Sequence, residues 1–138
     1  MIRVVLDTNV VVSAYLSPDG PPSRIVRLAL AGLIRCCVCE EIVAEYREVL
    51  ARFRANPRST VLFLKKISQA SAMTKIGGAA RVAAERDDDV FLACAKAAKA
   101  SYLVTGNLRH FPRTYRYSMT LRPADFLLRW QAEQRPTV

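Results

Sequence analysis

The segment Arg3–Asp7 constrains the fold more than any other part of the chain. Val4, Val5 and Leu6 form a continuous apolar run that ends directly at Asp7. Such a run is typical of a strand that is buried on both faces of a parallel sheet. The strand would carry Asp7 to the carboxyl edge of the sheet, where a charge among apolar residues needs a partner.

Helical and extended patterns alternate along the chain. Extended patterns cover residues 3–7, 35–39, 74–76 and 101–107 and the start of 118–130; helical patterns begin at Pro22, Glu40, Arg58, near Asp87 and at Pro123. This alternation predicts an α/β fold, a three-layer α/β/α sandwich with a mainly parallel central sheet, and residues 1–138 form a single domain. In such folds ligands gather beyond the carboxyl ends of parallel strands.

The charge balance indicates a polyanionic partner. The net charge is +9, from 21 Lys and Arg against 12 Asp and Glu. Because guanidinium groups match the geometry of phosphates, nucleic acid is the favoured partner. No apolar run approaches the ~20 residues that a membrane span needs. No secretory signal is apparent, so we expect no membrane association and a cytoplasmic location.

The four cysteines do not indicate a zinc site. Cys36, Cys37, Cys39 and Cys94 lack the paired Cys-x-x-Cys spacing of structural zinc sites. We expect small buried side chains in a reducing compartment, with Cys37 and Cys39 on one face of their strand and Cys36 on the other.

Acidic residues from three segments could meet at the edge that holds Asp7. Helical spacing places Glu45 on the inward face of its helix and leaves Glu41 and Glu48 nearer solvent. A third carboxylate comes from the start of a later helix. Three carboxylates in a partly desolvated pocket need a cation, and Mg²⁺ or Mn²⁺ prefers such oxygen ligands. The set is therefore Asp7, Glu45 and either Asp88 or Asp89.

Each acid also has a purely structural interpretation. Asp7 could cap a turn, Asp88 or Asp89 could cap a helix, and Glu45 could pair with Arg47. Nucleophile elbows, phosphate-binding loops and Cys–His signatures are missing from the sequence, which leaves metal-assisted hydrolysis. Response-regulator receivers and aspartate-nucleophile phosphatases also place Asp after a first strand. They fit worse, since the latter require Asp-x-Asp where this chain has Asp-Thr-Asn.

Four segments resemble a known family. "VVLDTNVVVSAYL", "EYREVLARF", "DDDVFLACA" and "YLVTGN", in this order, are similar to PIN-domain ribonucleases, above all to VapC-type toxins of bacterial toxin–antitoxin systems. The resemblance implies a Mg²⁺- or Mn²⁺-dependent endoribonuclease in which Asp7, Glu45 and Asp88 or Asp89 bind the metal. Many relatives carry a fourth Asp where this chain has Asn107, so a second metal would bind weakly.

The resemblance also implies supporting residues and partners. Asn9, Ser13, Thr105 and Asn107 would orient ligands or water by hydrogen bonds, or else serve as turn formers. A cognate antitoxin and a homodimer are expected. A housekeeping nuclease would have the same pocket, and the rival function is a nucleic-acid-binding module that has lost catalysis.

The segment after Asn107 suggests a path for RNA. Four basic residues alternate there with aromatic ones, so the segment can hold phosphates and stack unpaired bases. The RNA would be single-stranded, or structured like tRNA. The alternative is a solvated basic loop over core aromatics. The basic residues are Arg109, His110, Arg113 and Arg116.

Overall fold

The computed structural model describes residues 1–53, 56–76 and 87–135. Within these residues, six strands form one sheet in the order β3-β2-β1-β4-β6-β5. All neighbouring strands are parallel except β5, which is antiparallel to β6. The predicted mainly parallel sheet is confirmed. The strands are β1 (Arg3–Leu6), β2 (Arg35–Val38), β3 (Ala72–Met73), β4 (Tyr102–Val104), β5 (Thr114–Tyr115) and β6 (Ser118–Leu121).

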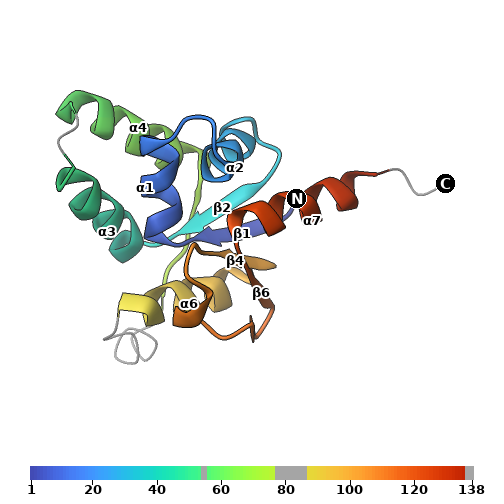
Figure 1. Cartoon of the computed structure of the whole chain (residues 1–138). Helices are drawn as coiled ribbons and strands as arrows, with labels where there is room; N and C mark the ends of the chain where they lie inside the picture. Colours follow the sequence, from blue (N-terminus) through green and yellow to red (C-terminus); the bar gives the residue numbers. More distant parts are fainter. Residues whose placement is uncertain (54–55, 77–86, 136–138) are drawn as a thin grey trace.

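Helices cover both faces of the sheet. Figure 1 shows α6 on one side of the strands and α1 to α4 on the other, and α7 packs against α2. This arrangement confirms the predicted three-layer α/β/α sandwich. The helices are α1 (Thr8–Leu16), α2 (Pro21–Leu30), α3 (Glu40–Ala51), α4 (Pro57–Ala70), α6 (Asp87–Ala98) and α7 (Pro123–Gln134), with a 3₁₀ turn η1 (Leu108–His110).

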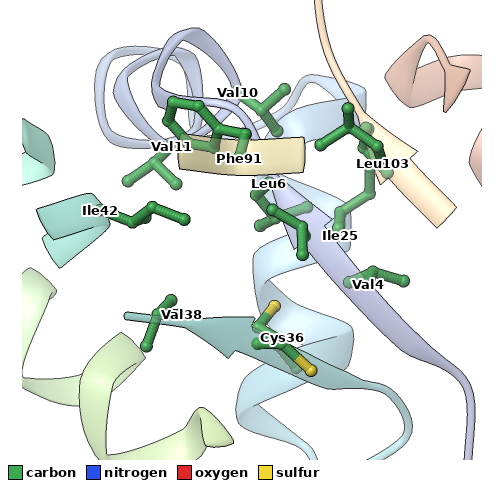
Figure 2. Close-up of a cluster of buried hydrophobic side chains, with 14 of the residues drawn as sticks. Val4, Leu6, Val10, Val11, Ile25, Cys36, Val38, Ile42, Phe91 and Leu103 are labelled. Atoms are coloured by element: carbon green, nitrogen blue, oxygen red, sulfur yellow. The ribbon is translucent and has the colours of Figure 1, made fainter. Parts of the chain in front are cut away.

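The core lies around β1. Its apolar side chains are buried, and Figure 1 shows helices on both sides of this strand. Figure 2 shows Leu6 among side chains of several elements, including Val10 of α1, Ile25 of α2, Ile42 of α3 and Phe91 of α6. Burying one side chain of this kind stabilises the fold by about 1.5–3 kcal/mol. The packing therefore fixes the end of β1, and with it the position of Asp7.

The strand register brings three chain segments to one edge. Leu6 of β1 is paired with Val104 of β4, and Val104 is paired with Leu121 of β6. The next residue of each strand therefore lies at the same level, at the carboxyl edge of the sheet. These next residues are Asp7, Thr105 and Arg122.

Two predicted elements begin or end elsewhere. The predicted strand position of 74–76 is wrong, because β3 covers Ala72–Met73. The last hydrogen bond to β2 is the one of 2.7 Å that Thr74 N donates to Val38 O, and the chain then leaves the sheet. The helix predicted from Pro22 to beyond Gly32 begins at Pro21 and ends at Leu30. Gly32 stops it, with a φ of 77° that favours glycine.

Helix α4 buries only part of its apolar side chains. Leu64 and Ile67 are buried, whereas Val61 and Leu62 are 63% and 53% exposed. Helix α1 was not predicted at all, because its run of valines has low helix propensity. Its N-terminus is capped by Asp7.

The cysteines are buried, as the sequence predicts, and free. Burial raises the pKa of the Cys36 thiol to about 12. Cys39 contacts Cys94 of α6, whereas Cys36 lies on the other face of β2. Among the helices in the described part of the chain, none is long and apolar enough to cross a membrane.

Candidate active site at the sheet edge

Asp7 is a buried carboxylate with three described hydrogen-bond donors. It is 8% exposed. Its Oδ1 accepts a bond of 2.8 Å from Thr8 N, and its Oδ2 accepts bonds of 3.1 Å from Asn9 Nδ2 and 2.7 Å from Thr105 Oγ1. These donors offset the cost of burying a charge. The structural interpretation also holds, because the bond to Thr8 N caps α1.

Thr105 and Asn9 join the ends of β1 and β4. The Thr105 side chain is fully buried, and its hydroxyl donates to Asp7 while accepting a 3.0 Å bond from Asn107 N. Asn9 donates to Asp7 and accepts a 3.0 Å bond from Gly106 N through Oδ1. Both side chains thus fix the position of the Asp7 carboxylate relative to the loop after β4.

Glu45 lies on α3 and faces the start of α1. It is half-buried, and its Oε2 accepts a hydrogen bond from Thr8 Oγ1. Thr8 therefore contacts both acids, because its main-chain N–H donates to Asp7. The structure brings Asp7 and Glu45 to one edge, as the sequence predicts. Arg47, the alternative partner of Glu45, lines a separate hollow between α3 and α4.

Two residues next to these acids were missed in the sequence. Thr8 links them, and Tyr46 donates its hydroxyl to Leu6 O, directly before Asp7. Burial raises the pKa of Tyr46 well above its usual value, and nearby Cys36, Cys94, Asp7 and Glu45 add to this in the same direction. Tyr46 therefore stays a neutral donor. The Asp-Thr-Asn motif could have indicated Thr8; the burial of Tyr46 follows from tertiary packing.

Two other glutamates of α3 differ in their exposure to solvent. Glu48 is exposed, as predicted, and forms an ion pair of 3.2 Å with Arg52. The expectation for Glu41 is wrong, because it is half-buried and its Oε2 atom is inaccessible. The reason is its place in the first turn of α3, where its carboxylate contacts the Cys39 side chain.

The third predicted acid lies at the start of α6. Asp88 and Asp89 are in its first turn, but their side chains lie outside the described part of the structure. Among the described side chains, no group of three His, Cys, Asp or Glu is placed to hold a metal ion. Asp7 and Glu45 offer only oxygen atoms, as do the nearby threonine hydroxyls, and this donor set fits a hard cation such as Mg²⁺ or Mn²⁺.

Ser13 and Asn107 have different surroundings from those of Asp7. Ser13 is exposed on α1, and no hydrogen bond within the described residues joins its side chain to Asp7 or Glu45. Asn107 caps η1, with Oδ1 accepting from Arg109 N at 3.3 Å and Nδ2 lying 3.1 Å from His110 Nε2. Asn107 thus connects the edge to the basic segment.

The basic residues of this segment line different hollows. Arg109 and Arg113 line one hollow, together with Arg122, which was not predicted. Arg116 lines another hollow, beside Tyr102 and Arg129. His110 contacts the Asn107 side chain through Nε2 and lines neither of these two hollows.

The expected aromatic stacking is wrong for Phe111. Its ring is 6% exposed and packs edge-to-face on Phe91 of α6, with centroids 6.3 Å apart. Tyr115 is half-buried. Tyr117 is 61% exposed, with Lys99 Nζ 6.0 Å from its ring centroid. The alternative of a basic loop over core aromatics therefore describes Phe111 correctly.

The comparison with protein families agrees with this geometry. The PIN-domain profile matches residues 3–109, so the chain belongs to the PIN-domain family. PIN-domain proteins are nucleases that generally use divalent metal ions. No curated protein matches the chain.

Two solved structures share the fold. One is VapBC2 from Rickettsia felis, bound to a DNA fragment from their promoter; it is 16% identical with a TM-score of 0.63, over 88% of this chain and 98% of that chain. The other is PAE2754 from Pyrobaculum aerophilum, also 16% identical with a TM-score of 0.63, over 95% of this chain and 96% of that chain. The similarity covers nearly the whole of all three chains.

Proposed function

We propose that this protein is a divalent-metal-dependent endoribonuclease that hydrolyses RNA phosphodiesters. One observation carries the proposal: a buried aspartate after β1 is held by Thr105 and Asn9 and linked through Thr8 to Glu45, in a chain of the PIN-domain family. A buried carboxylate that several donors hold in one orientation beside a second acid is typical of a functional site.

The proposed roles follow from the positions of the side chains. Asp7 and Glu45, with Asp88 or Asp89, would hold Mg²⁺ or Mn²⁺. When bound, the ion polarises the phosphodiester and lowers the pKa of the attacking water. Thr105 and Asn9 keep the Asp7 carboxylate in one orientation, because each donates to its Oδ2. Ser13 and Asn107 are proposed to orient water at the rim.

The RNA would approach across the basic segment. Arg109 and Arg113 are exposed beside the edge, and their guanidinium groups suit phosphates. His110 and Arg116 would add contacts on either side of them. The net charge of +9 would attract a polyanionic strand, single-stranded or structured like tRNA, from a distance.

We further propose that the protein is the toxin of a toxin–antitoxin pair. The support is the fold shared with the Rickettsia felis VapBC2 structure and the segments that resemble VapC-type toxins. The partner would be a cognate antitoxin protein, the assembly a homodimer and the location the cytoplasm.

A cleavage assay tests the nuclease proposal. The purified protein is incubated with a mixed-sequence RNA in Mn²⁺, Mg²⁺ or EDTA, alongside Asp7→Asn. We expect cleavage with either metal, none in EDTA, and a loss of about a thousandfold or more in Asp7→Asn. Full activity of Asp7→Asn would contradict the assignment of this site.

A binding module without catalysis is the second candidate. The observation that favours it is Asn107, whose neutral amide caps η1 and contacts His110. A site with one fewer carboxylate holds metal less tightly. This candidate predicts salt-sensitive RNA binding by wild type and Asp7→Asn alike, with no cleavage by either protein.

A further inference from the structure

Arg122 has the same place after β6 that Asp7 has after β1. Leu6, Val104 and Leu121 lie side by side in three neighbouring parallel strands. With strands about 4.8 Å apart, the main chains at Asp7 and Arg122 are separated by roughly 10 Å. Ligands of parallel sheets bind at this edge. Arg122 therefore lies at the same edge of the sheet as the proposed metal ligand.

A hollow opens beside Arg122. It has a volume of about 510 Å³ and lies between η1, the β5–β6 hairpin and the start of α7. This volume is within the range of roughly 300–1,000 Å³ that small-molecule sites occupy. Arg109, Arg113 and Arg122 line it, and Leu108, Met119 and Leu121 add apolar surface.

The loop after β4 links the candidate active site to the wall of the hollow. Thr105 donates to Asp7 and accepts from Asn107 N, and Asn107 caps the turn that contributes Leu108 and Arg109. The hollow therefore lies beside the same edge of the sheet as Asp7.

The three guanidinium groups are not neutralised by described acids. Among the described residues, Glu48 and Arg52 form the only ion pair within 4.0 Å, and it lies at α3, away from these arginines. Asp125 is the acid that lines the hollow, and it makes no such pair there. The positive charge is thus available to a ligand. Planar guanidinium forks match phosphate oxygens.

We propose that this hollow binds one unpaired nucleotide of the RNA, next to the phosphodiester held at Asp7. The guanidinium groups of Arg109, Arg113 and Arg122 contact its phosphate, and its base lies on the apolar surface of Leu108 and Leu121. The inference rests on the proposed function, because the ligand is the substrate strand itself.

Asp125 gives the hollow a preference among bases. The two oxygens of a carboxylate can accept two parallel hydrogen bonds, and its negative charge repels phosphate groups. Guanine presents two N–H donors side by side on its Watson–Crick edge, and single-stranded RNA exposes that edge to proteins. The hollow therefore selects guanine over adenine.

Binding to a catalytically impaired protein tests the hollow apart from the chemistry. Asp7→Asn in EDTA is titrated with a fluorescent oligouridine that contains one guanine, and anisotropy is recorded at several salt concentrations. Adding Arg122→Gln should weaken binding about tenfold. It should also lower the slope of log K against log salt by about 0.7 for each lost phosphate contact. Asp125→Asn should reduce the preference for guanine over adenine.

Arg58→Gln is the matched control, since Arg58 is exposed on α4 and far from β6 in the fold. It should change binding less than twofold. Equal weakening by Arg58→Gln and Arg122→Gln overturns the proposal, because binding then reflects net charge alone. Absence of saturable binding also overturns the proposal. So does a result in which inorganic phosphate displaces the oligonucleotide equally well from the protein with Arg122→Gln and from the protein without it.

Thermal unfolding checks that Arg122→Gln keeps the fold, and Arg113→Gln on the exposed loop serves if it does not. RNA cleavage by the wild-type protein, measured in parallel, reports on the proposed function separately. If the wild-type protein cleaves RNA but neither Arg122→Gln nor Arg113→Gln weakens binding, the hollow is not a nucleotide site. The proposed nuclease function is then still supported.

Discussion

Two regions at the same edge of the sheet are built in opposite ways. Around Asp7 the polar side chains are hydrogen-bonded to one another, and Asp7, Thr8 and Thr105 are buried. Around Arg122 the charges are exposed, and the described acids do not pair with them. The first arrangement suits groups that must hold one geometry, and the second suits groups that bind a mobile polyanion.

The difference predicts how each region responds to mutation. Losing a partner inside the buried network leaves another polar group unsatisfied, at a cost of about 1–3 kcal/mol. Losing an exposed arginine removes one screened contact with the ligand and leaves the fold intact. Changes near Asp7 should therefore affect turnover and stability, and changes near Arg122 should affect binding alone.

After Asp7 itself, the largest effect is expected at Glu45. Glu45→Gln keeps an acceptor for the Thr8 hydroxyl but removes the negative charge, so cleavage should fall at least about a hundredfold. Glu48→Gln on the same helix is the matched control, because Glu48 is exposed and pairs only at the surface. Single-turnover cleavage rates measure both. Similar rates for the two variants would remove Glu45 from the site.

A smaller effect is expected at Thr105. Thr105→Val keeps the shape but removes the hydroxyl that joins Asp7 to Asn107. Activity should fall about 10–100-fold, and the free energy of unfolding by about 1–3 kcal/mol. Thr105→Ser restores the hydroxyl and should recover most of both quantities. Urea unfolding and cleavage assays are compared; a Thr105→Val protein as active as wild type contradicts a positioning role.

The exposed region should respond through the Michaelis constant. Arg113→Gln is expected to raise KM several-fold while kcat changes little, because the lost contact is made equally in the ground and transition states. Steady-state kinetics at two salt concentrations provide the check. A fall in kcat with unchanged KM would show that this arginine acts on the chemical step.

The smallest effect is expected at Arg116. This residue lines a different hollow, beside Tyr102 and Arg129. Arg116→Gln should change KM by less than about twofold, as expected for a screened charge. The same assay tests it. A loss as large as that of Arg113→Gln would mean that the RNA wraps around the hairpin.

The sequence predicts best those features that depend on local pattern. The run Val4–Leu6 reveals a buried strand and places Asp7 at its end, and the spacing along α3 turns Glu45 inward. Both follow from the periodicity of strands and helices. Glu41 shows the limit of helical periodicity, since its half-buried carboxylate contacts Cys39 at the start of α3.

Features that depend on distant pairing could not be predicted. Arg122 lies level with Asp7 because β6 pairs with β4 and β4 with β1, and this register spans most of the chain. Helix α1 forms over valines with low helix propensity, since Asp7 caps it and the core buries its side chains. Tertiary contacts overrule local preference at both places.

A metal site at Asp7 and Glu45 is tested most directly by Mn²⁺ binding without RNA, followed by electron paramagnetic resonance. We expect saturable binding by the wild-type protein, at least about tenfold weaker binding by Asp7→Asn and by Glu45→Gln, and no change in Glu48→Gln. Equal Mn²⁺ affinity in all four proteins would contradict a metal site built on Asp7 and Glu45.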